Sequence, residues 1–187
     1  MSEEYQYNTY EEAEIAVKES GYRLEYVRPD LQTPEMAEMA VKKNSHSLEY
    51  VRPDLQTPEL AEIAVKDWGY NIKRVRPDLQ TPELALKAVK WDGWTFEYVR
   101  KDLITPEMAM MAVKYRSCNL KHVPAHLATP EMAEMVVRSW GLNLKYVPAH
   151  LQTQEIIEIA LKQDPDNSKY IKIKEMFKNA LEEALAD

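Results

Sequence analysis

The sequence predicts an all-α solenoid of 24-residue repeats, on the strength of three observations. First, threonine recurs every 24 residues without insertion or deletion, and most copies open the tripeptide Thr-Pro-Glu: Thr9, Thr33, Thr57, Thr81, Thr105, Thr129 and Thr153. Second, apolar residues follow each threonine at helical spacing. Third, 45% of the 187 residues are hydrophobic, which is enough to bury a core. We number the repeats 1 to 7 from these threonines.

The repeats define the expected organisation of the chain. Residues 1–8 form an N-terminal tail, and residues 9–163 hold six complete repeats plus the first helix of a seventh. Residues 164–187 form a C-terminal capping helix, and we expect the whole chain to be one domain. Each repeat has one helix and a shorter, Pro-interrupted second helix. Since neither helix can bury its apolar stripe alone, successive repeats must stack.

The first helix of each repeat has recognisable ends. Thr is a good N-cap, Pro is tolerated at the first helical position, and Glu beside it complements the positive end of the helix. A Lys or Arg nine residues after the Thr lies in the last turn. We expect the glycines that follow the helix to end it in a left-handed conformation: Gly21, Gly69, Gly93 and Gly141.

Apolar residues stand three, four, seven and eight positions after the Thr, as in Leu60, Ala61, Ala64 and Val65, except that repeat 1 has Glu12 at the first of these positions. At about 100° per residue these positions form one stripe. The small alanines let helices of successive repeats approach closely.

The second helix of each repeat carries an i, i+3, i+7 pattern, as in Leu48, Val51 and Leu55. The proline of Arg-Pro-Asp or Pro-Ala-His limits it to one or two turns. After Asp164 the chain departs from the repeat, and 168–185 has the amphipathic spacing of a helix that closes the open core.

Charge and composition exclude several classes of function. A net charge of −7 and a pI near 5.3 argue against a nucleic-acid partner, which requires an excess of Lys and Arg. Residues 1–20 lack the apolar core of a signal peptide, and no apolar run is long enough for a membrane span. We therefore expect a cytoplasmic protein, or one in a host cytosol if it is delivered as an effector.

The repeat resembles an uncharacterised short helical repeat family, DUF 4116. The resemblance covers about residues 9–163 and rests on Ala-Val-Lys at 64–66, on Gly69 and on Tyr-Val-Pro at 146–148. It implies an all-α repeat fold without an established activity. The occurrence of that family in bacteria, their viruses and some protists implies that a host-directed role is open to this chain as well.

Departures from the repeat indicate where a partner binds, because residues that break a strong pattern without a stacking reason are candidates for function. Five residues after the Thr, other repeats carry Glu, but repeats 4 and 5 carry Leu86 and Met110. The predicted partner-binding residues are Leu86, Trp91, Trp94, Ile104, Met110 and Tyr115. Trp68 and Trp140 share one position and are a candidate extension. The alternative is that all of these are locally repacked core residues.

Other candidate sites have simpler explanations. Arg28, Arg52, Arg76 and Arg100 form a candidate anion row, but an Asp two residues after each Arg favours Arg–Asp pairing. His122 and His126 are spaced like metal ligands, but Pro124 between them breaks the helix such a pair requires. Cys118 occupies a variable position, which disfavours a nucleophile. We predict no catalytic residue, no metal and no cofactor.

These observations favour a non-enzymatic scaffold that binds another protein or a second copy of itself. One alternative is a small inhibitor or effector of microbial or viral origin that blocks a host or defence enzyme. A third hypothesis is binding of an anionic ligand or nucleic acid along the Arg rows, with an affinity that falls steeply with salt.

Overall fold

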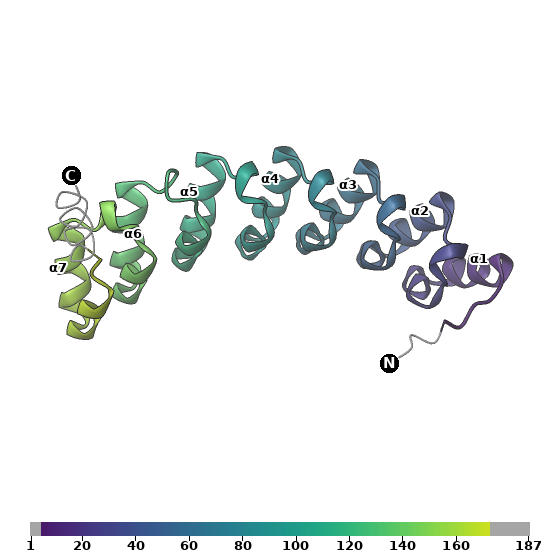
Figure 1. Ribbon diagram of the computed structural model, residues 1–187, viewed down its shortest axis with the longest axis horizontal. Helices are drawn as coiled ribbons and strands as arrows, with labels where there is room; N and C mark the ends of the chain where they lie inside the picture. The colour runs from purple at the N-terminus through teal and green to yellow at the C-terminus, as the bar shows by residue number, and fades with distance from the viewer. Residues whose placement is uncertain (1–4, 173–187) are drawn as a thin grey trace, which may run out of the picture. The chain divides into compact units, whose positions relative to one another are not determined.

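The computed structural model describes residues 5–172, and these residues are all-α, as the repeat predicts. Each repeat begins with a ten-residue α-helix (Figure 1): α1 (Tyr10–Glu19), α2 (Pro34–Lys43), α3 (Pro58–Asp67), α4 (Pro82–Trp91), α5 (Pro106–Tyr115), α6 (Pro130–Ser139) and α7 (Gln154–Gln163). The contacts divide the chain into a first unit, residues 1–103, and a second unit, residues 104–187.

The second half of each repeat is a 3-10 helix of six residues: η1 (Gly21–Tyr26), η3 (Ser45–Tyr50), η5 (Gly69–Arg74), η7 (Gly93–Tyr98), η9 (Ser117–His122), η10 (Gly141–Tyr146) and η12 (Pro165–Tyr170). In most repeats a three-residue 3-10 turn follows: η2 (Pro29–Leu31), η4 (Pro53–Leu55), η6 (Pro77–Leu79), η8 (Lys101–Leu103) and η11 (Ala149–Leu151). The Pro-interrupted second helix is therefore confirmed, with 3-10 geometry. Of the predicted capping helix, residues 164–172 contain η12, and the remainder lies outside the described residues.

The threonines cap the helices as predicted. Thr9 forms a complete capping box with Glu12, and the hydroxyl of Thr57 accepts a hydrogen bond from the Leu60 N–H at 3.3 Å. The remaining five threonines accept the same bond from the third residue of their helices. Each repeat therefore starts from the same N-terminal geometry.

The glycines do not end the helices in the predicted way, because none of the four has a positive φ. The helix instead ends at an extended residue such as Ser20 or Trp68. At Gly21 and Gly69 the next repeat approaches too closely for a side chain. A Cβ on Gly21 would lie 2.3 Å from the Ala40 carbonyl oxygen of α2, and one on Gly69 would lie 2.8 Å from the Trp91 Cβ of α4.

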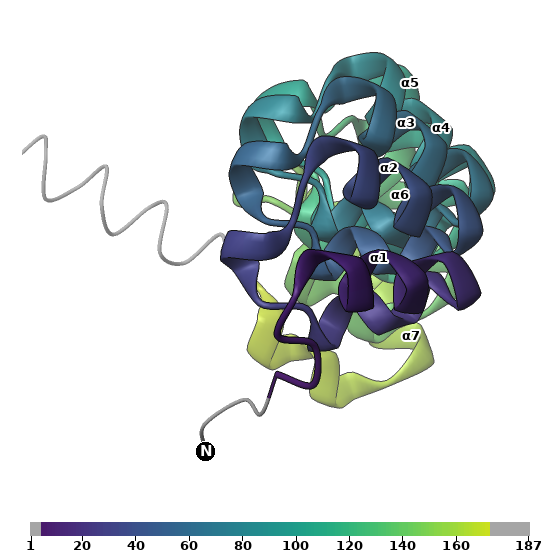
Figure 2. The ribbon, with the colours of Figure 1, turned by 90° about the vertical axis from the view of Figure 1, so that its right-hand side faces the viewer.

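The helices stack in chain order within each unit. In the first unit α1, α2, α3 and α4 lie side by side, each against the next, with the six-residue 3-10 helices between them (Figure 1). Figure 2 views this unit from the side of α1, where residues 5–8 run beside η1 and Tyr7 forms an isolated bridge with Val27. In the second unit α6 packs on both α5 and α7.

Alanines make this close stacking possible. The alanines four positions after the threonines are completely buried in six successive repeats: Ala13, Ala37, Ala61, Ala85, Ala109 and Ala133. Larger side chains beside them, such as Met36, Phe96 and Leu144, fill the interior. The predicted apolar stripe is thus the core of each unit.

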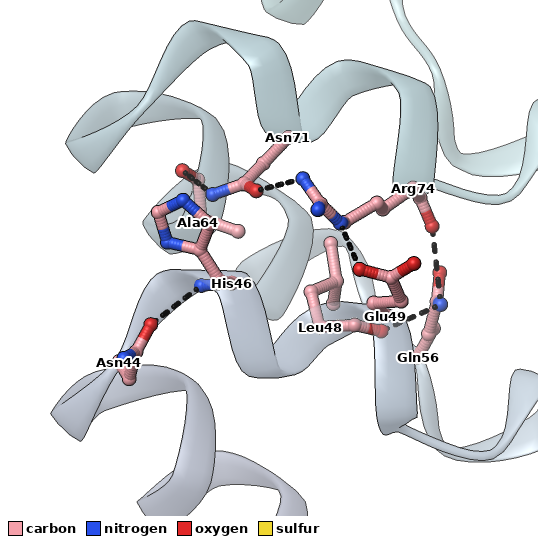
Figure 3. A network of polar contacts seen from close by, with 8 residues as sticks. All are labelled: Asn44, His46, Leu48, Glu49, Gln56, Ala64, Asn71 and Arg74. Atoms are coloured by element: carbon pink, nitrogen blue, oxygen red, sulfur yellow. Dashed lines mark hydrogen bonds and ion pairs between the residues drawn. The ribbon is translucent and has the colours of Figure 1, made fainter. Parts of the chain in front are cut away.

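Buried glutamines join successive repeats. Gln56 is 9% exposed; its Nε2 donates to the Arg74 carbonyl at 3.2 Å, and its Oε1 accepts from the Arg76 N–H at 3.1 Å (Figure 3 shows the first bond). Gln32, Gln80 and Gln152 accept in the same way from the N–H twenty residues later. We call this arrangement the glutamine bridge.

The glutamine bridge is absent wherever its donor is absent. Counted twenty residues on, the partners of Ile104 and Ala128 are Pro124 and Pro148, and proline has no N–H. A glutamine at 104 or 128 would bury an amide oxygen without that donor. An apolar side chain therefore replaces the amide where the bridge cannot form.

Candidate partner-binding surface

Aromatic rings from successive repeats meet in the first unit. The residue thirteen positions after each Thr is the second residue of a six-residue 3-10 helix, and it is Tyr22, His46 and Tyr70 in repeats 1 to 3. Since the repeats stack in register, these side chains emerge next to one another. The ring centroids of Tyr22 and His46 lie 6.2 Å apart.

Trp68 and Trp91 fill the space between these rings. The Trp68 ring lies 3.8 Å from His46 and 6.0 Å from Tyr70, measured between centroids. The Trp91 ring lies 6.2 Å from Trp68 and meets Tyr70 edge-on at 6.4 Å. Tyr98 adds a further contact to Tyr70 at 5.9 Å.

We call this set of rings the aromatic edge: Tyr22, His46, Trp68, Tyr70, Trp91 and Tyr98. Each pair of Tyr and Trp rings contributes about 0.5–1.5 kcal/mol beyond the burial of its area. The rings draw on all four repeats of the first unit, so the edge is continuous along that unit.

The aromatic edge is partly open to solvent. Tyr22 is 44% exposed and Trp91 47%, and the other four rings are half-buried. Trp94, at the same repeat position as Tyr22, is also exposed. Trp and Tyr concentrate at the centres of protein interfaces, because their rings bury a large area at a small entropic cost.

A network of polar contacts adjoins the aromatic edge at His46 (Figure 3). Asn44 accepts from the His46 N–H at 3.0 Å, which fixes the start of η3. Arg74 donates to Glu49 at 2.7 Å and to Asn71 at 3.1 Å, and Asn71 donates to the Ala64 carbonyl of α3 at 2.9 Å. Burial, followed by the positive charge of Arg74, lowers the pKa of His46.

No family model, no curated protein and no solved structure matches this chain. The resemblance to the DUF 4116 repeat stays a prediction. None of the helices within residues 5–172 has the length and apolar character needed to cross a membrane.

The predicted partner-binding residues of the first unit differ in exposure. Trp91 and Trp94 are exposed, as a binding role requires, and Trp68, the candidate extension, lies in the aromatic edge. Leu86 is half-buried. In most repeats a Glu five residues after the Thr is followed by an apolar residue, whereas α4 has the apolar Leu86 followed by Lys87. Lys87 pairs with Glu62 of α3.

In the second unit, Tyr115 and Trp140 are exposed and Met110 is half-buried. Tyr115 and Trp140 line a common hollow of about 360 Å³ together with Cys118 and Met135. The structure therefore brings together one predicted partner-binding residue and one candidate extension that are 25 positions apart in the chain.

Ile104 is the predicted site residue that the structure contradicts. Its side chain is only 7% exposed, so it belongs to the core and offers no surface to a partner. The departure from glutamine at this position has the stacking reason given above, since Pro124 supplies no N–H for a bridge.

The guanidinium groups of the candidate anion row are bound by other groups of the same chain. Arg28, Arg52, Arg76 and Arg100 each bind the Asp two residues later through two nitrogens. The third nitrogen of Arg52 donates to the Pro29 carbonyl of the preceding repeat at 3.0 Å, and Arg76 and Arg100 make the equivalent bond. The predicted Arg–Asp pairing is present, and it leaves these guanidinium groups few donors for an anion.

The sequence predictions missed most of the aromatic edge. Tyr22, His46 and Tyr70 occupy the same variable repeat position as Cys118, and a variable position alone indicates no function. The signal that identifies them is their shared 24-residue spacing, which places a ring at the same point of consecutive repeats.

Proposed function

We propose that the protein is a non-enzymatic binding module that holds another protein by the aromatic edge of its first unit. The observation that carries the proposal is a run of mutually contacting rings that includes the exposed Trp91 of repeat 4. Trp94 of the same repeat is exposed as well. Exposed Trp and Tyr side chains that are held rigidly lose little entropy when a partner covers them.

A protein partner fits this surface better than a nucleic acid does. The rings pack against one another, so they do not present separate faces on which successive bases can stack. The net charge of −7 also opposes a phosphate backbone. Protein interfaces, in contrast, are built around buried aromatic anchors.

The test compares two tryptophans that differ in position and resemble each other in exposure. A partner captured from the native cell is purified, and its affinity is measured for the unaltered protein, for Trp91→Ala and for Trp140→Ala. We expect Trp91→Ala to weaken binding at least about 30-fold, since a hot-spot Trp contributes about 2 kcal/mol or more. Trp140, exposed in the second unit, serves as the matched control and should leave the affinity unchanged.

Circular dichroism of each variant confirms that the helices are retained. Unchanged affinity for Trp91→Ala with the helices intact would exclude the aromatic edge as the binding surface. Light scattering on the pure protein separates a foreign partner from self-association, because only the latter gives a dimer that Trp91→Ala disperses.

A further inference from the structure

Three tyrosines and two carboxylates surround a hollow between repeats 1 and 2. Tyr26 ends η1 and Tyr50 ends η3, and each follows a glutamate, Glu25 or Glu49. Tyr5 completes the wall, because the Gln6 N–H beside it bonds to the Tyr26 carbonyl at 3.1 Å. The hollow has a volume of about 340 Å³, which suits a small ligand or one side chain.

We propose that this hollow binds an organic cation, an alkylammonium or guanidinium group, through the faces of its tyrosine rings and the charge of Glu25. A cation over an aromatic ring is attracted by the negative face of the π system, and surrounding rings with a nearby carboxylate recognise quaternary ammonium groups. The hollow shares no residue with the aromatic edge, so this function is separate from protein binding there.

The chain itself places a cation on the equivalent tyrosine in other repeats. Lys145 Nζ lies 4.8 Å from the centroid of the Tyr146 ring, and Lys169 Nζ lies 5.3 Å from that of Tyr170. These Lys-Tyr pairs occupy the repeat position at which repeats 1 and 2 carry Glu25-Tyr26 and Glu49-Tyr50. In repeats 1 and 2 the chain thus supplies a carboxylate in place of the ammonium group.

Repeat 3 shows a cation beside the equivalent carboxylate. Arg74, which takes the repeat position of Tyr50, donates to Glu49 of the preceding repeat at 2.7 Å (Figure 3). Tyr50 in that position leaves Glu25 without a Lys or Arg partner among residues 5–172. Glu25, which lines the hollow, therefore has no Lys or Arg of the described residues paired with it.

The charge of Glu25 favours a cation in the hollow, whereas Glu49 is already paired with Arg74. Burial raises the pKa of Tyr50, and the negative charges of Glu25 and Glu49 raise it further. Arg52 borders the hollow through its bond to the Pro29 carbonyl, but its other nitrogens bind Asp54. Its charge is therefore largely compensated.

The experiment titrates the protein with choline chloride and with 3,3-dimethyl-1-butanol, the neutral carbon isostere of choline, while the tyrosine ring resonances are followed by NMR. We expect choline to shift the Tyr26 and Tyr50 resonances with saturation, and the isostere to leave them unchanged. A parallel titration with N-acetyl-arginine amide distinguishes the guanidinium side chain of a partner from a small quaternary cation.

Two variants identify the site. Glu25→Gln should weaken choline binding on the order of fivefold or more, because one such contact is worth about 1 kcal/mol. Glu97→Gln is the matched control, since Glu97 precedes Tyr98 at the same repeat position and does not line the hollow. Equal shifts with the neutral isostere, or an unchanged affinity for Glu25→Gln, would overturn the proposal.

Discussion

His46 is the residue whose charge most directly affects the aromatic edge. Its imidazole packs against the Trp68 ring at a tilt of 47°, with 3.8 Å between the ring centroids. Burial holds its pKa below the ordinary value of 6.5, with Arg74 adding to the effect. Lys73 lowers the pKa as well, whereas Asp67 and Glu49 raise it. The neutral form is therefore favoured in the folded protein.

This shift predicts a loss of stability in mild acid. As the pH falls below 6.5, the unfolded chain takes up a proton at His46 before the folded chain does, so the free energy of unfolding decreases. Above that pH, His46 adds no pH dependence. Urea denaturation at about pH 7.5 and about pH 5.5 should show a smaller decrease for His46→Tyr than for the unaltered protein.

Tyrosine is a suitable replacement because repeats 1 and 3 carry it at the same position. His126→Tyr, at an exposed turn of the second unit, should behave like the unaltered protein. An equal decrease for His46→Tyr would show that His46 does not cause the acid effect.

The packing of repeat 1 against repeat 2 depends on the absence of a Cβ at Gly21. Gly21 lies against the Ala40 carbonyl of α2, too close for any side chain, while repeat 2 carries Ser45 at the same position. Ser45 is 3% exposed, so the second and third repeats already accommodate a Cβ there. The two positions are equivalent in sequence and different in packing.

Gly21→Ala should therefore lower stability, and Ser45→Ala should not. The added methyl group must push α2 away from η1, which costs about 1–3 kcal/mol. Ser45→Ala removes only a buried hydroxyl that has no hydrogen-bond partner within residues 5–172, so stability should stay the same or rise slightly. Thermal denaturation followed by circular dichroism checks both, and equal midpoints would contradict the packing argument.

The helical elements were predictable because their signals are local. Threonine N-caps, prolines at the first turn and the alanine stripe act within one helix, and the structure confirms each. The role of the glycines was not predictable, because it depends on a carbonyl in the next repeat. The prediction that Ile104 binds a partner was wrong for the same reason, because the absence of a glutamine at this position is explained by Pro124, twenty residues away.

At the scale of the whole molecule, stability is the sum of contacts between neighbouring repeats. Gln56→Ala removes a glutamine bridge and leaves the Arg76 N–H without its acceptor. The expected loss is about 1–3 kcal/mol. Since repeats contact only their neighbours, hydrogen exchange should accelerate in repeats 2 and 3 and stay unchanged in α6 and α7.

Gln154→Ala is the matched control, because its exposed amide donates to Glu158 on the same helix at 3.0 Å and makes no hydrogen bond with another repeat in the described part of the chain. It should leave both stability and exchange unaltered. Faster exchange throughout the chain for Gln56→Ala would mean that the repeats unfold together.

The glutamine bridge also governs how such an array can grow. A gene duplication that copies repeat 3 ahead of an Arg-Pro-Asp repeat supplies both the amide and its N–H donor, as Gln56 and Arg76 do. The same copy inserted ahead of repeat 5 would face Pro124 and bury an unsatisfied oxygen. The repeats therefore fall into two classes, those that supply the N–H donor of the glutamine bridge and those that have proline in its place. Exchanging repeats within a class keeps this contact satisfied, and exchanging them between classes leaves a buried amide oxygen unsatisfied.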